Sequence, residues 1–144
     1  FGSFVREALR DGAGKVVAIE PSPECLPCLR RTFAREIADG RGAIVAKGVW
    51  DEEGEMVLNL PAIGYGGASL VFEFAEGGRG KVKVPLTTID RIVSDLQLPR
   101  VDFIKMDIEG AERRAIVGSG DTLRRFGPAS AAAPPAAARP KGGV

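Results

Sequence analysis

The sequence predicts an α/β fold in which a mainly parallel sheet carries helices on both faces. Short apolar runs at residues 15–20, 43–46 and 101–106 have the composition of buried parallel strands. Segments with helical spacing of apolar residues alternate with these runs, which is typical of parallel sheets. The length of 144 residues suits about one such domain.

The first half of the chain is expected to form helix, strand, helix and strand in that order. Residues 4–10 place apolar side chains on one helical face, and Ser3 is the expected N-cap. The strand at 15–20 ends in an acidic residue. Ser22 is expected to cap the next helix, whose apolar residues recur at helical spacing over 26–37. The strand at 43–46 follows a glycine turn.

The second half begins with an excursion from the parallel pattern. Residues 55–60 alternate weakly, and 69–74 and 81–84 are expected to pair as an antiparallel hairpin across a glycine turn. A helix is expected to open at residues 87–90, because apolar residues then follow at spacings of three and four. The strand at 101–106 leads into a helix expected over 109–117.

The two ends of the chain differ from a complete α/β domain. The first helix lacks the strand that normally feeds it, so we expect a domain over residues 1–127 that is truncated at both ends, with its first strand missing. Residues 128–144 are rich in alanine and proline, and we expect a disordered tail there.

Charge and composition exclude several classes of function. The net charge is +1 for the whole chain, and residues 1–127 carry 18 basic and 19 acidic side chains. We therefore expect neither nucleic-acid nor membrane binding. No signal peptide and no membrane-spanning run is evident, which favours a cytoplasmic location. Histidine is absent, so a Ser-His-Asp triad, a Cys-His dyad and a His-ligated metal are excluded.

Two groups of charged residues stand at strand ends. Glu20 follows an apolar strand, where a carboxylate can accept hydrogen bonds from both ribose hydroxyls of a nucleotide, although a solvated strand-end acid is an equally simple reading. Lys105 and Asp107 lie two apart on the strand at 101–106. Glu109 and Glu112 are expected to share one face of the following helix. These four are the candidate catalytic residues, with a Lys105–Asp107 ion pair and favourable helix-dipole contacts as the structural alternatives.

Other motifs are weaker. Cys25 and Cys28 form a Cys-x-x-Cys pair, but on an amphipathic helix we expect them to be packed rather than to bind metal. Trp50 offers a flat surface for an adenine and is as readily a core residue. Tyr65 lies in a glycine-rich loop, where a substrate contact and a plain surface position are both open.

Three segments together resemble the FkbM-type methyltransferases. They are Val-Val-Ala-Ile-Glu-Pro-Ser-Pro-Glu at 16–24, Leu-Thr-Thr-Ile-Asp at 86–90, and the stretch at 101–112 with its Lys-x-Asp-x-Glu-Gly core. The resemblance runs from about residue 2 to about residue 123. It implies a Rossmann-like class I methyltransferase sheet and S-adenosylmethionine as the cofactor. Its expected acceptor is a hydroxyl on a small molecule or saccharide.

The resemblance also implies roles for single residues. Gly2 corresponds to the last glycine of the cofactor loop, Glu20 to the ribose-binding acid, and Val49 and Trp50 to the adenine lining. Asp107 corresponds to the active-site edge, where it positions the cofactor or the acceptor. The stretch at 67–70 resembles a loop near the substrate. No metal is required, although Asp107 and Glu109 are oxygen ligands of the kind magnesium prefers.

Two alternatives to a methyltransferase stay open at this point. A nicotinamide-dependent oxidoreductase would also use Glu20, but it leaves the cluster from Lys105 to Glu112 without a role. A non-catalytic truncated remnant or interaction module would follow from the missing first strand. The acceptor and the oligomeric state are not encoded in any recognisable motif.

Overall fold

The computed structural model describes residues 2–61, 68–71 and 80–132, and it is a mixed α/β structure, as the sequence predicts. The chain divides into two compact units, Phe1–Gly48 and Val49–Val144. The described strands form three small sheets rather than one. No described helix has both the length and the apolar character needed to cross a bilayer.

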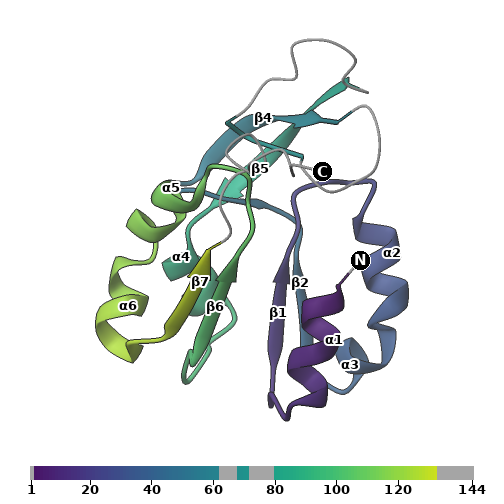
Figure 1. Cartoon of the computed structure of the whole chain (residues 1–144), viewed down its shortest axis with the longest axis vertical. Helices are drawn as coiled ribbons and strands as arrows, with labels where there is room; N and C mark the ends of the chain where they lie inside the picture. Colours follow the sequence, from purple (N-terminus) through teal and green to yellow (C-terminus); the bar gives the residue numbers. More distant parts are fainter. Residues whose placement is uncertain (1, 62–67, 72–79, 133–144) are drawn as a thin grey trace, which may run out of the picture. The chain divides into compact units, whose positions relative to one another are not determined.

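The first unit contains a parallel strand pair with three helices. β1 and β2 lie side by side, with Val16 opposite Gly42 and Ile19 opposite Val45 (Figure 1). Helix α1 contacts β1, and α3 contacts β2. The apolar side chains of Cys25, Leu29 and Phe33 are buried. The elements are α1 (Ser3–Arg10), β1 (Val16–Ile19), α2 (Leu26–Thr32), α3 (Ala34–Ala38) and β2 (Gly42–Val45).

The helix expected from Ser22 onward starts later and is interrupted. Its N-cap is Cys25, and Phe33, at φ −111°, separates α2 from α3. Pro27 explains the late start, because it has no N–H and therefore fits only in a first helical turn. Likewise α1 is capped by Gly2 with no side-chain hydrogen bond, so the expected Ser3 cap is wrong.

A second sheet has the strand order β3-β5-β4, with β4 and β5 antiparallel, and comprises β3 (Gly48–Val49), β4 (Gly54–Leu60) and β5 (Gly80–Thr87). Leu58, Leu60 and Val84 form its buried core. The antiparallel partner of β5 is β4, whereas the sequence pairs 81–84 with 69–74. Of that segment, 72–74 lie outside the described residues, and Ser69 makes one isolated bridge to Asn59 of β4. The reason is burial, since the β4–β5 register brings this apolar core together.

The remaining elements of the second unit are α4 (Ile89–Asp95), β6 (Phe103–Met106), α5 (Glu112–Val117), α6 (Gly120–Phe126) and β7 (Ala129–Ala132). Thr88 caps α4, since its Oγ1 accepts the Arg91 N–H at 3.0 Å, in agreement with the helix start expected there. Strands β6 and β7 lie side by side and parallel (Figure 1). Strand β7 falls within the expected tail, so disorder from residue 128 is wrong for 129–132. Residues 133–144 lie outside the described residues.

Candidate functional site

The carboxylate of Glu20 lies directly after β1. The Glu20 N–H continues the strand pairing by donating to the Val45 carbonyl at 3.0 Å. The Ser22 N–H donates to Glu20 Oε1 at 2.8 Å, which holds the partly buried side chain at the strand end. Burial raises the pKa of the Glu20 carboxyl, and the Ser22 N–H opposes that shift without cancelling it. Glu20 thus presents a held carboxylate at the end of a parallel strand.

Gly2 occupies a position that excludes any side chain. Its φ is 68°, in the left-handed region that favours glycine. A Cβ built on Gly2 would stand 2.4 Å from Cε2 of Phe33. The start of α1 therefore lies against the Phe33 ring, between α2 and α3, because this residue is glycine. Its expected role in a cofactor loop stays a prediction.

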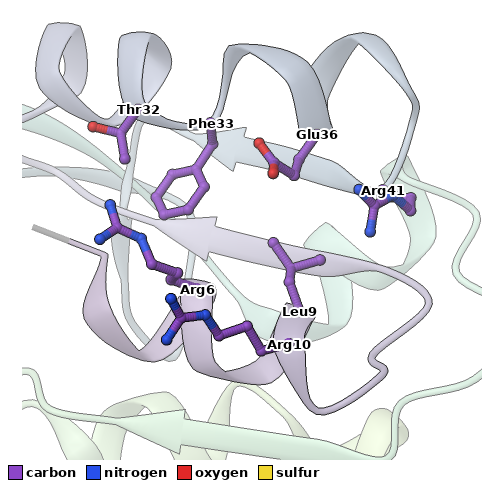
Figure 2. A pocket seen from close by; sticks show the side chains of 7 residues that line it. All are labelled: Arg6, Leu9, Arg10, Thr32, Phe33, Glu36 and Arg41. Atoms are coloured by element: carbon purple, nitrogen blue, oxygen red, sulfur yellow. The ribbon is translucent and has the colours of Figure 1, made fainter.

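A pocket of about 390 Å³ lies elsewhere in the first unit. Figure 2 shows Arg6, Leu9 and Arg10 from α1 on one wall, opposite Thr32, Phe33 and Glu36. Arg41 completes the lining. The arginines are exposed to solvent, and Glu36 lies among them. Neither Gly2 nor Glu20 lines this pocket, so it is separate from the expected cofactor residues.

In the second unit, Val49 and Trp50 follow one another at the sheet edge. Val49 is buried, and the Trp50 N–H donates to the Thr87 carbonyl at 2.9 Å, which continues the pairing of β3 with β5. The partly buried indole of Trp50 has the guanidinium carbon of Arg114 at 5.4 Å from its ring centroid. Arg114 Nη1 also pairs with Asp51 Oδ2 at 2.5 Å.

The Lys105–Asp107 ion pair is present at the end of β6. Lys105 Nζ lies 3.4 Å from Asp107 Oδ2, with both side chains partly exposed. The strand is not buried on both faces, since Phe103 is 47% exposed and lies on the same side as Lys105. A lysine buried in an apolar strand would cost free energy and so suggest a function. Lys105 is partly exposed and paired with Asp107, so its place in β6 does not by itself indicate a function.

Glu109 and Glu112 do not share a helical face, and that expectation is wrong. Helix α5 begins at Glu112, while Glu109 and Gly110 have φ of 49° and 101° and form a turn before it. Glu112 Oε1 accepts the Ile108 N–H at 3.3 Å, so this carboxylate ties the turn together. The left-handed backbone at two consecutive residues cannot continue a right-handed helix. The four candidate residues nevertheless all lie between the end of β6 and the first residue of α5.

Ser69 has a structural role that the resemblance of the stretch at 67–70 to a substrate loop does not indicate. The buried Ser69 hydroxyl donates to the Glu109 carbonyl at 2.9 Å and accepts the Val71 N–H at 3.0 Å. The Ser69 backbone is bridged to Asn59 of β4. Ser69 therefore fixes the turn that carries Glu109. The sequence feature that could have pointed to Ser69 is its position directly after a glycine-rich stretch. Gly67 and Tyr65 of that stretch lie outside the described residues.

Metal binding has no support from the described residues, in which no group of three or more His, Cys, Asp or Glu side chains could hold an ion. Cys25 is buried, and burial raises the pKa of its thiol, more than its hydrogen bond with Ser22 lowers it. A raised pKa disfavours the thiolate that metal or redox chemistry requires. The expected packing role of Cys25 is confirmed.

Comparison with known proteins identifies a family for this chain. The family model described as "Methyltransferase FkbM domain" matches residues 1–130. No curated protein and no solved structure matches the chain. The family match covers the first unit, the second unit up to residue 130, and every residue identified from the sequence as a candidate for binding or catalysis.

Proposed function

The chain belongs to the FkbM methyltransferase family, and we propose that it transfers a methyl group from S-adenosylmethionine to a hydroxyl of a sugar or natural product. The observation that carries the choice of cofactor is Glu20, a held carboxylate at the end of a parallel strand. Such a position suits the two donor hydroxyls of a ribose. S-adenosylmethionine supplies an electrophilic methyl group when bound.

This proposal assigns the ribose and the adenine of the cofactor to different residues. Glu20 would accept hydrogen bonds from the ribose, and Gly2, with a φ of 68°, would belong to the turn of the cofactor loop. Val49 and the indole of Trp50 would supply apolar surface for the adenine. A Rossmann-like arrangement of the sheets, an alanine- and proline-rich tail beyond β7, and a cytoplasmic location belong to the same proposal.

The acceptor residues follow from the turn after β6. We assign Asp107 to positioning the acceptor hydroxyl, with Lys105 at 3.4 Å holding its carboxylate. Glu109 is the candidate base, because Ser69 fixes the backbone that carries it. Glu112 is engaged with the Ile108 N–H, so its part is to shape the turn. Alignment of the attacking oxygen would then account for much of the rate enhancement.

The direct test of this assignment is methyl transfer by an Asp107→Asn variant. Labelled S-adenosylmethionine would be offered with a panel of hydroxylated sugars and natural products, and transfer of label to oxygen would be measured. We expect Asp107→Asn to lower the rate by about a hundredfold or more, since misplacing the acceptor is that costly. Circular dichroism should show an unchanged fold.

Asp102→Asn is the matched control for this test. Asp102 lies on the same stretch of chain, makes an exposed ion pair with Arg100, and carries the same charge. Its rate should stay within about twofold of wild type, because exposed pairs contribute little. A wild-type rate in Asp107→Asn would refute the role given to Asp107.

A further inference from the structure

Arg114 joins α5 to the segment that carries Trp50. Its guanidinium carbon lies over the indole, 5.4 Å from the ring centroid, and its Nη1 pairs with Asp51 at 2.5 Å. One arginine therefore contacts two consecutive residues at the sheet edge. Arginine suits this double contact because its planar guanidinium both stacks on aromatic rings and binds carboxylates.

Asp51 depends on this contact for charge compensation. Its side chain is only 17% exposed. The second carboxylate oxygen, Oδ1, is buried and accepts no hydrogen bond within the described part of the chain. Burying a carboxylate costs free energy unless the group is paired with a cation. Loss of Arg114 would therefore favour conformations in which the Asp51 carboxylate is exposed to solvent. Movement of Asp51 would displace the adjoining Trp50.

Helix α5 and the residue that follows it approach this segment at a second point. A Cβ built on Gly118, four residues after Arg114, would stand 2.2 Å from the Trp50 carbonyl oxygen. The Gly118 carbonyl in turn accepts the Asp90 N–H at 3.0 Å. The backbone of residue 50 thus lies against Gly118 and is hydrogen-bonded to Thr87, while the indole of Trp50 lies against Arg114.

We propose that Arg114 is a positioning residue for the cofactor, which covers one face of the Trp50 indole and fixes the ring so that its remaining surface receives the adenine. The proposal rests on the proposed function, because it takes Trp50 to line the adenine. It adds a residue on α5 whose contact with the cofactor is indirect, through Trp50 and Asp51.

Trp50 is the only tryptophan of the chain, so its fluorescence reports directly on this contact. The experiment is a titration of S-adenosylhomocysteine into the full chain, followed by Trp50 emission and by calorimetry. We expect Arg114→Gln to weaken binding about tenfold and to alter the emission of the free protein. Arg114→Lys, which keeps the charge beside Asp51 but loses the planar stacking, should fall between that variant and wild type.

Arg113→Gln is the matched control, because Arg113 is the exposed neighbour on the same helix. It should bind and fluoresce like wild type. Wild-type affinity in both Arg114 variants would overturn this inference and leave the proposed function intact. No binding by a folded wild-type chain would overturn both. If Arg114→Gln does not fold, wild-type affinity and emission in Arg114→Lys would still overturn the inference.

Discussion

At the scale of single residues, the pKa of Glu20 depends on its burial and on its hydrogen bond to Ser22. A strand-end acid is visible in the sequence, because an apolar run and a proline turn flank it. Its burial and its bond to the Ser22 N–H are not, since both depend on how the following turn folds back. The raised pKa of Glu20 is therefore a property of the folded chain, and it has a consequence for binding.

Cofactor affinity should depend on pH through Glu20. Ribose hydroxyls donate to the ionised carboxylate, so binding favours the charged form. Since burial raises the pKa of Glu20 in the free protein, affinity should fall as pH drops through that raised pKa, above the usual value of about 4.3. Calorimetric titrations with S-adenosylhomocysteine from pH 7.5 down to about pH 4, close to the ordinary carboxyl pKa, would measure this.

The Glu20→Gln variant supplies the control for that pH profile. Its residual affinity should be independent of pH over the same range, because the amide does not titrate. The same substitution should not destabilise the free protein at neutral pH. A raised folded-state pKa contributes stability below the unfolded pKa, and this is lost as pH rises through the folded value. A wild-type profile as flat as that of the variant would contradict the assignment.

At the scale of elements, the sequence predicts a helix start correctly where the capping side chain lies within the same few residues, as at α4, and not at α1, α2 or α5. The start of α4 follows from Thr88, whose hydroxyl caps the helix, and that information lies within a few residues. The turn at 109–110 was not predicted, because its left-handed backbone is fixed by a hydrogen bond from Ser69, 40 residues away. The site carboxylates could be listed from sequence, but their arrangement could not.

Asp90 links two helices, and this predicts acid-sensitive stability. Its carboxylate accepts the Asp121 N–H and the Thr122 N–H and hydroxyl, at 3.0, 2.8 and 2.6 Å, and so caps α6 from α4. Burial alone would raise the pKa of Asp90. The hydrogen bonds and the charge of Arg124 outweigh it, so the pKa is lowered. Asp90→Asn keeps only one acceptor oxygen and so loses a hydrogen bond to α6, which should lower the free energy of unfolding by about 1 kcal/mol at neutral pH.

Denaturant unfolding as a function of pH would check this prediction. A lowered folded-state pKa contributes stability above the unfolded pKa, and the contribution is lost as pH falls through the folded value. The gap between wild type and Asp90→Asn should therefore close below about pH 4. Asp95→Asn, which removes an exposed pair with Arg91, should change stability by less than about 0.5 kcal/mol. Equal effects of the two substitutions at neutral pH would contradict the capping role.

At the scale of the whole molecule, the α/β class and the family were within reach of the sequence. The class follows from the alternation of apolar runs and helical spacing, and the family from the segment around Lys105, Asp107 and Glu109. The strand partners were harder. Strand β7 is an alanine-rich segment with little strand propensity of its own, and it becomes a strand because β6 offers it hydrogen-bonding partners. Such pairing depends on tertiary context, which a local pattern does not contain.

The measurement that tests the central claim most directly is calorimetric titration of S-adenosylhomocysteine and NAD into wild type, Glu20→Gln and Glu7→Gln. Glu7 is an exposed acid on α1 and serves as the matched control. We predict that wild type and Glu7→Gln bind S-adenosylhomocysteine in preference to NAD. Glu20→Gln, while still folded, should lose about tenfold or more in affinity, as expected when a charged hydrogen-bond acceptor is removed. Preference for NAD, or equal S-adenosylhomocysteine affinity in all three proteins, would contradict a methyltransferase cofactor site at Glu20.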